Sequence, residues 1–326
     1  MGKVIFTSNR PLERAENLKA VWDAFDGEKD FALMLPGGTC PEAERAEELG
    51  YSVIVADEFL QRPIIGKKRV KYVHVSHGAA GGKTYGLDQS WKYITPENGA
   101  QVDYFIASSE AGVPISARQA GIPEERCLPL GMPRTDKLFG LKKGDGGTEL
   151  ATRTRRAYLF APSFRADWWE PPMPKIDWAA VSGMLDEYET VYVKRHMCTK
   201  KPLVDGDYPN VVELSPDVPS WPYVVDCDVI ATDYSTIIAD GYVLGKPAAL
   251  FCPDWRDYCG IRGMYFDYPD EYCSIAANDE RSFVDAMRCA FIDGMGNVEK
   301  RALELLAGAC DGHSAERVVG LIEGLL

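Results

Sequence analysis

The residues best suited to chemistry in this sequence stand where predicted strands end. His77 follows an apolar run over residues 70–75 and opens a glycine-rich stretch that ends at Lys83. A phosphate-binding P-loop needs a glycine at the position of His77, so the stretch does not match that motif. A flexible glycine run between a histidine and a lysine still suits the close approach of an anionic group. The alternative is an ordinary turn in which His77 caps the main chain.

A second basic group closes the apolar run at 191–193 and consists of Lys194, Arg195 and His196. Three cations at the end of a strand would stabilise a phosphate there. A lone basic triplet is otherwise usually a solvated run of charge, and that alternative stays open.

A third strand end carries hydroxyl groups. The run at 229–231 is followed by Asp233, Ser235 and Thr236, and a helix is expected to continue to residue 244. Hydroxyls and free N–H groups at a helix N-terminus bind phosphate, helped by the helix dipole. Simple capping of the helix by Asp233 or Ser235, worth about 1 kcal/mol, is compatible with the same pattern.

Two arginines occupy comparable loop positions. Arg165 follows the apolar run at 158–160, and Arg262 stands before a glycine between tyrosines. A guanidinium donates two parallel hydrogen bonds to a phosphate, although an isolated arginine is usually a surface residue. Together with Lys83 and the basic triplet, these arginines would gather positive charge at the loops of one cleft.

The elements that must position these residues alternate between strands and helices. Continuous apolar runs separated by helical segments are typical of parallel sheets that are covered on both faces. Strands are expected at 4–6, 31–35, 51–56, 70–75, 103–107, 127–130, 158–160, 191–193, 211–214, 229–231 and 248–251. Helices are expected at 12–25, 41–49, 178–188, 280–292, 298–309 and 314–325, the last one capped by Ser314.

A glycine-rich break over residues 140–152 divides the pattern in two. We therefore expect an α/β protein of two doubly wound, Rossmann-like domains. The first covers residues 1–140 and the second 154–326, with a linker at 141–153 and the last helix returning to the first domain. Ligands of such domains bind at the carboxyl ends of the strands, here facing the cleft between them.

Composition excludes several classes of protein. The 326 residues hold 36 Lys and Arg against 49 Asp and Glu, a net charge of −13, which disfavours a nucleic-acid partner. The nine cysteines lack the spacing of a zinc site, the histidines number four, and free thiols fit a reducing compartment. No apolar stretch reaches the length of a membrane span, and the N-terminus does not resemble a signal peptide. A cytoplasmic protein without a metal is expected.

The order of these motifs resembles the CDP-glycerol glycerophosphotransferase family, whose members build teichoic acids and related poly(alditol phosphate) chains. The resemblance covers roughly residues 70–320. Its elements are His77-Gly78 with Lys83, then 131–136 (GMPRTD), 160–165 (FAPSFR), 194–196 (KRH), 228–236 (DVIATDYST) with Asp240 and Lys246-Pro247, 258–267 and 311–317 (DGHSAER).

The resemblance implies a glycosyltransferase-B-like fold with no cofactor or metal. It implies transfer of an alditol phosphate from a CDP-activated donor to a hydroxyl of a glycan or lipid-linked acceptor, with release of CMP. His77 would be the general base and His196 a second catalytic group. The donor would be held by Arg165, Lys194, Arg195, Asp233, Ser235, Thr236 and Arg262. Further substrate contacts are expected from Lys83, Arg134 and Asp267.

Departures from the family pattern bear on the acceptor. Ser76 stands where the family usually has Trp, Ala79 to Gly82 replace a Thr-Pro-Leu segment, and Met197 replaces a Pro. The short, acidic chain favours a single transfer over processive polymerisation, and leaves room for a peripheral contact with the inner membrane face. The alditol, the acceptor and the oligomeric state stay open. A nucleotide-sugar glycosyltransferase of the same fold and a non-catalytic nucleotide-binding relative are the alternatives.

Overall fold

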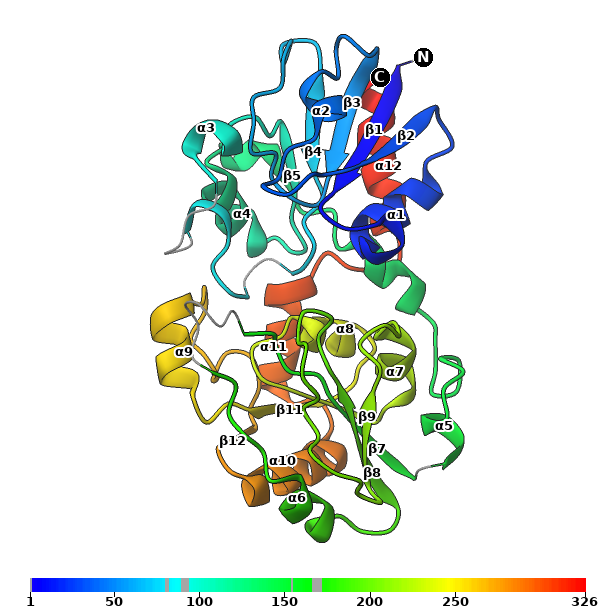
Figure 1. Ribbon diagram of the computed structural model, residues 1–326, viewed down its shortest axis with the longest axis vertical. Coiled ribbons are helices and arrows are strands. Elements are labelled where there is room, and N and C mark those ends of the chain that lie inside the picture. Colours follow the sequence, from blue (N-terminus) through cyan, green and yellow to red (C-terminus); the bar gives the residue numbers. More distant parts are fainter. Residues whose placement is uncertain (1, 80–81, 89–93, 154, 166–171) are drawn as a thin grey trace. The chain divides into compact units, whose positions relative to one another are not determined.

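The computed structural model describes residues 2–79, 82–88, 94–153, 155–165 and 172–326. Residues 80 and 81 of the predicted glycine run lie outside this set. The chain divides into two compact units, Met1–Lys137 with Glu304–Leu326, and Leu138–Leu303 (Figure 1). The sequence placed the first boundary at residue 140 and a linker at 141–153, whereas in the structure the segment from Leu138 onward belongs to the second unit.

The first unit is built on a six-stranded parallel sheet in the order β2-β1-β3-β4-β5-β6. Its strands are β1 (Lys3–Ser8), β2 (Lys29–Leu33), β3 (Tyr51–Ala56), β4 (Lys71–His74), β5 (Tyr104–Ile106) and β6 (Cys127–Leu128). Its helices are α1 (Glu16–Ala24), α2 (Pro41–Glu44), α3 (Pro96–Gly99), α4 (Gly112–Ala120) and α12 (Ser314–Leu325), with short 3-10 turns η1 (Leu12–Arg14), η2 (Gly86–Asp88), η3 (Glu124–Arg126) and η4 (Pro133–Leu138). The strand order reverses between β1 and β3, which is where sheets of this kind bind ligands.

Alternation along β1 divides the apolar core of the first unit between the two faces of the sheet. Val4 and Phe6 belong to a cluster that includes Val318 and Ile322 of α12, while Ile5 joins a different cluster on the other face. α12 packs against α1 and β3, as Figure 1 shows for the C-terminal helix. Burial of this apolar stripe accounts for the return of the chain's end to the first unit.

The second unit carries a six-stranded parallel sheet in the order β12-β11-β10-β7-β8-β9. Its strands are β7 (Arg156–Phe160), β8 (Glu189–Lys194), β9 (Val211–Leu214), β10 (Val229–Thr232), β11 (Ala248–Phe251) and β12 (Ala276–Ala277). Its helices are α5 (Leu150–Arg153), α6 (Trp178–Met184), α7 (Trp221–Asp226), α8 (Ile237–Val243), α9 (Trp255–Arg262), α10 (Glu280–Asp293) and α11 (Asn297–Ala307), the last of which leads back into the first unit. The strand order of this sheet reverses between β7 and β10. This position is its switch point, as the position between β1 and β3 is that of the first sheet.

Several elements are shorter than the sequence pattern predicts. The helix expected over 178–188 ends at Met184, because the Asp186 N–H turns to the Glu189 carboxylate at 3.0 Å. The helix expected over 41–49 is helical only to Glu44, and the Tyr51 N–H bonds to the Ala46 carbonyl at 2.9 Å instead of extending the helix. The predicted strand at 127–130 covers only Cys127–Leu128.

The glycine-rich segment predicted as a linker is wrapped around one carboxylate. Asp226, at the end of α7, accepts hydrogen bonds from the N–H groups of Gly144, Gly146 and Thr148 at 2.8–3.0 Å. The Thr148 hydroxyl donates to the same side chain at 2.7 Å. This segment is therefore an ordered part of the second unit, because a fully buried carboxylate organises its main chain.

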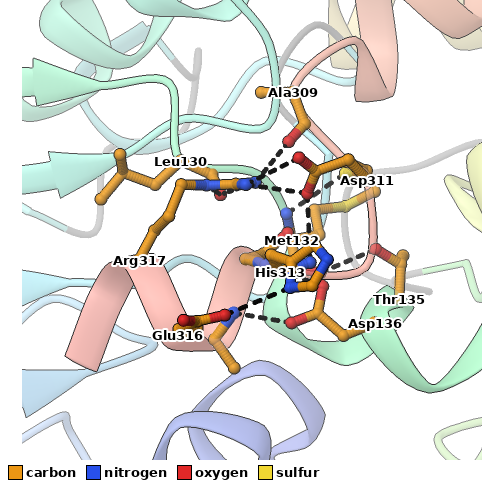
Figure 2. A network of polar contacts seen from close by, with 12 residues as sticks. Leu130, Met132, Thr135, Asp136, Ala309, Asp311, His313, Glu316 and Arg317 are labelled. Carbon is orange, nitrogen blue, oxygen red and sulfur yellow. Dashed lines mark hydrogen bonds and ion pairs between the residues drawn. The ribbon is translucent and has the colours of Figure 1, made fainter. Parts of the chain in front are cut away.

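Two of the motifs that carried the family resemblance join to hold α12 in place (Figure 2). Asp136 accepts the N–H groups of Ser314 and Ala315 at 3.0 and 2.7 Å, so it caps the helix that Ser314 was expected to cap. Arg317 donates to the Asp311 carboxylate at 2.8 Å and to the Leu130 carbonyl at 2.9 Å. These motif residues have a structural role in the first unit.

Candidate functional site

The switch point of the first sheet collects charged side chains from three strand ends. Arg10 follows β1, Asp57 and Glu58 follow β3, and His77 follows β4. Parallel strands end at the same edge of the sheet, so these residues meet although they are up to 67 positions apart. This group is the candidate site of the first unit.

The main chain that presents His77 is held in a tight turn. Ser76 has a φ of 55°, a left-handed conformation that costs about 1 kcal/mol for a residue other than glycine. Its N–H donates to Nδ1 of the buried His74 at 3.1 Å, and its carbonyl accepts Nδ2 of Asn17 at 3.2 Å. Because the surrounding contacts impose this conformation, the direction of the His77 side chain is set by the fold.

Glu58 faces the imidazole of His77. The distance from His77 Nδ1 to Glu58 Oε1 is 3.5 Å, an ion-pair distance. Arg10 Nη2 donates to the same carboxylate oxygen at 2.9 Å, and the Tyr85 hydroxyl donates to the other oxygen at 2.8 Å. The Tyr85 ring also meets the His77 ring edge to face, with centroids 5.4 Å apart. The carboxylate is thus anchored on both sides while it faces the ring.

The electrostatic surroundings keep His77 neutral at neutral pH. Loss of water around the ring, followed by the charge of Arg10, lowers the pKa of His77 to about 4, against an opposing effect of the Asp57 carboxylate. Burial raises the pKa of both Asp57 and Glu58. A neutral imidazole that is 41% exposed is able to accept a proton from a hydroxyl group.

Arg134, predicted to contact substrate, lies beside His77. It stands on η4 and donates from Nη1 to the His77 carbonyl at 3.3 Å, while its own N–H donates to Asn17 Oδ1 at 3.0 Å. Glu16 lies 3.9 Å from the guanidinium. Lys83, the other expected substrate contact in this unit, is half-buried beyond the glycine run.

In the second unit the basic triplet follows β8, and its three side chains have different environments. Lys194 is buried and donates to the carbonyls of Arg195 and Pro216 at 3.1 and 3.2 Å. Arg195 lies 3.2 Å from the Glu213 carboxylate. His196 is exposed, and its ring stacks on Phe164 with centroids 5.6 Å apart.

One contact of His196 indicates which of its ring nitrogens carries the proton. Its Nδ1 accepts the Cys198 N–H at 3.1 Å, so the neutral ring carries its proton on Nε2. That Nε2–H is a hydrogen-bond donor, the property required of a group that contacts phosphate or assists a leaving group.

Arg165 and Asp233 form a buried pair at the switch point of the second sheet. Arg165 Nη1 lies 2.9 Å from Asp233 Oδ2, and its Nη2 lies 3.4 Å from Asp254. The guanidinium also lies over the stacked rings of Tyr234 and Tyr258, 4.4 Å from the latter. The Arg165–Asp233 pair thus joins the loop after β7 to the loop after β10. Binding of donor phosphate by these residues stays a prediction.

The hydroxyl residues after β10 stand at the N-terminus of a helix, as the sequence predicts. Ser235 and Thr236 are half-buried and stand before α8, which begins at Ile237. Ser235 Oγ accepts the Ile237 N–H at 3.4 Å, whereas the Asp233 carboxylate bonds the N–H groups of Ser163 and Tyr234. Asp233 therefore does not cap α8.

The remaining predicted donor and substrate residues lie around α9. Arg262 is the last residue of this helix and is half-buried. Asp267 is exposed, and its N–H donates to Glu271 at 2.8 Å. Their binding roles, like those of the other residues named above, stay predictions.

Sequence reasoning did not select Arg10, Asn17, Asp57, Glu58 or Tyr85. A signal existed for three of them, because Asp57 and Glu58 directly follow the predicted strand at 51–56 and Arg10 closely follows the first strand. Asn17 and Tyr85 carried no local signal, since the contact of Asn17 with Ser76 and that of Tyr85 with Glu58 depend on tertiary packing.

Among the residues that the structure describes, no group of three or more His, Cys, Asp or Glu side chains is placed to hold a metal ion. Within the same residues, no helix combines the length and the apolar character that a membrane crossing requires.

Two doubly wound parallel sheets, each with polar side chains at its switch point, define a protein of two Rossmann-like α/β units, and solved structures confirm this predicted fold class. The wall teichoic acid polymerase TagF matches with a TM-score of 0.76 at 15% identity, covering 99% of this chain and 89% of that one. The UDP-GlcNAc 2-epimerase from Neisseria meningitidis matches with a TM-score of 0.63 at 10% identity, over 99% and 100% of the two chains.

Sequence comparison then identifies the family. The model for CDP-Glycerol:Poly(glycerophosphate) glycerophosphotransferases matches residues 5–324, so the chain belongs to this family, as the motif order predicted. A teichoic acid ribitol-phosphate primase of Bacillus spizizenii is 25% identical over 75% of this chain and 64% of its own length. A teichoic acid glycerol-phosphate primase of Bacillus subtilis is 23% identical over 84% of this chain and 74% of its own. The teichoic acid ribitol-phosphate polymerase TarK of Staphylococcus aureus is 27% identical over 82% of this chain and 55% of its own length.

Proposed function

We propose that this chain transfers an alditol phosphate, such as glycerol phosphate or ribitol phosphate, from a CDP-activated donor to an acceptor hydroxyl, with release of CMP. The observation that carries the proposal is the family match over residues 5–324, joined to a neutral histidine at the switch point of the first sheet. The similarity to both glycerol-phosphate and ribitol-phosphate enzymes leaves the alditol to experiment.

The proposed reaction is a displacement at phosphorus. The acceptor oxygen attacks the phosphorus atom that bears the alditol, and His77 removes the proton from that oxygen. A new phosphodiester bond forms, the bond from this phosphorus to the bridging pyrophosphate oxygen breaks, and CMP departs with that oxygen. General-base catalysis of this kind contributes about 10²–10⁴-fold to a rate.

The donor would bind to the second unit. His196 offers an Nε2–H at the exposed end of β8, and the neighbouring Arg195 is held by Glu213 at 3.2 Å. Hydrogen-bond donors aimed at phosphoryl oxygens stabilise the charge that grows in the transition state. Ser235, Thr236 and Arg262 would add contacts to the pyrophosphate, while Lys194 and Arg165 act from buried positions.

We place the reaction in the cytoplasm, with a glycan or lipid-linked glycan as the acceptor. All nine cysteines are free thiols, which fits a reducing compartment. The net charge of −13 gives no general attraction to an anionic bilayer, so a peripheral contact at the inner membrane face would need the acceptor itself.

The test is a nucleotide-release assay. The protein is incubated with CDP-glycerol, CDP-ribitol and UDP-sugars, each with and without glycan acceptors, and the release of CMP or UDP is measured. Acceptor-dependent release of CMP supports the proposal. Release of UDP with no CMP would instead favour a nucleotide-sugar glycosyltransferase, and nucleotide binding without any release would favour a non-catalytic relative.

A further inference from the structure

Glu58 is built into the first unit as a fixed carboxylate. Its side chain is only 13% exposed, and each of its oxygens accepts a hydrogen bond, one from Arg10 at 2.9 Å and one from Tyr85 at 2.8 Å. These donors come from the segments after β1 and beyond the glycine run, so the carboxylate is held from two directions. A side chain restrained in this way presents a constant geometry to its neighbours.

The group that this carboxylate faces is the His77 ring. Glu58 Oε1 lies 3.5 Å from Nδ1, slightly long for a hydrogen bond, and such contacts in ligand-free sites shorten when substrate binds. A carboxylate on one ring nitrogen holds the proton there and leaves the other nitrogen as the base. It also stabilises the imidazolium that forms when the ring accepts a proton.

We propose that Glu58 is a positioning residue for His77, holding the proton on Nδ1 so that Nε2 is the atom that receives the proton of the acceptor hydroxyl. This inference rests on the proposed transferase function. Arg10 and Tyr85 hold the Glu58 carboxylate in place by hydrogen bonds, and in this way they fix its position relative to the His77 ring.

The other charged groups around His77 are compatible with this assignment. Arg10, Asp57 and Glu58 face it from the ends of β1 and β3, while His74 of β4 is buried and its pKa is lowered to about 3, so it stays neutral. Arg134 reaches the His77 carbonyl rather than the ring, and Glu16 lies 3.9 Å from that guanidinium. Of the carboxylates in the described part of the chain, Glu58 is the one at ion-pair distance from Nδ1.

Asp57 is the matched control because it adjoins Glu58 and has a different environment. Its side chain is 1% exposed, its Oδ1 has no hydrogen-bond partner among the described residues, and its charge acts on His77 by raising the pKa of the ring. Asp57→Asn therefore tests whether the protonation of the His77 ring depends on Glu58 in particular or on any buried carboxylate of this segment.

The experiment compares the wild-type protein with Glu58→Gln, Glu58→Asp and Asp57→Asn by two independent readouts. The first is CMP release, resolved into kcat and KM for the CDP-donor. The second is the ¹⁵N shifts of the His77 ring at pH 7.5, assigned with His77→Gln, which report which nitrogen carries the proton and require no activity. Thermal unfolding establishes that each variant is folded.

We expect Glu58→Gln to lower kcat by roughly 100-fold or more with KM within about threefold, and to shift ring protonation away from Nδ1. Glu58→Asp should restore part of kcat, and Asp57→Asn should leave the ring tautomer as in the wild type. Unchanged ring shifts in Glu58→Gln, or a tautomer change found only in Asp57→Asn, would overturn the proposal. If the wild type releases no CMP while the ring shifts respond to Glu58→Gln, the transferase assignment fails and the His77–Glu58 pairing stands.

Discussion

Arg134 donates a hydrogen bond from Nη1 to the main-chain carbonyl of His77 at 3.3 Å, across 57 positions of sequence. The N–H of Arg134 bonds to Asn17, whose Nδ2 bonds to the Ser76 carbonyl, so the turn before His77 is tied to η4 and α1. None of these contacts uses the imidazole. The side chain of His77 can therefore be replaced while the main chain that carries it stays in place.

His77→Gln should abolish most acceptor-dependent CMP release, with a fall in kcat of about 10²–10⁴-fold, because glutamine cannot accept the proton at neutral pH. Binding of the CDP-donor, followed by calorimetry, should change by less than about threefold. His313→Gln is the matched control, since His313 is exposed and its side chain pairs, among the described residues, only with the exposed Glu316. Full activity in His77→Gln would remove this histidine from the mechanism.

Arg10→Met should move the acid limb of the pH profile upward. The charge of Arg10 contributes to lowering the pKa of His77 to about 4, so its removal raises that pKa toward the ordinary value of about 6.5. A smaller fraction of the ring is then neutral at any given acidic pH. The measurement is kcat/KM for CMP release between about pH 3 and 9, which covers the acid limb of the wild type and reports the free enzyme. A limb that stays in place, or moves to lower pH, contradicts the electrostatic role of Arg10.

Asp136→Ala should destabilise the protein by about 1–2 kcal/mol, because it leaves two N–H groups at the start of α12 without their acceptor. Urea unfolding followed by circular dichroism measures the change. Glu316→Ala, on the same helix with a side chain that is 80% exposed, should alter the free energy of unfolding by less than about 0.5 kcal/mol. A change in Asp136→Ala that is also below about 0.5 kcal/mol would show that the contact of Asp136 with α12 contributes nothing.

Asp226→Asn should lower the free energy of unfolding by about 1.5–3 kcal/mol at pH 7, because the buried carboxylate accepts four hydrogen bonds from the segment 144–148. Burial raises the pKa of Asp226, but these hydrogen bonds outweigh it and the net pKa lies below 3.8. A lowered carboxyl pKa stabilises the fold above the unfolded value and loses that effect as pH falls through the folded one.

The difference between wild type and Asp226→Asn should therefore shrink as the pH falls below about 4, measured by unfolding at a series of pH values. Asp205→Asn, at an exposed position near β9, is the control and should follow the wild type. A constant difference across the acid range would show that the carboxylate charge is not the stabilising feature.

Local pattern in the sequence was sufficient to place most strands and, with them, His77, Lys194 and Ser235 at strand ends. The spacing of apolar residues and the polar residues that end each run are properties of a single segment. They can therefore be recognised without knowing which segments pack against it. The same reasoning overestimated the helices at 41–49 and 178–188, because their ends depend on hydrogen bonds to neighbouring turn residues.

The family and the fold class followed from the sequence by itself, since the order of motifs and the alternation of strands and helices lie along the chain. Tertiary structure alone decided that Glu58 faces His77, that Asp136 caps α12 and that Asp226 holds the glycine-rich segment. Each of these pairings joins residues 19 to 178 positions apart. They depend on which strands lie side by side and which segments pack together, and a one-dimensional pattern of burial does not encode that order.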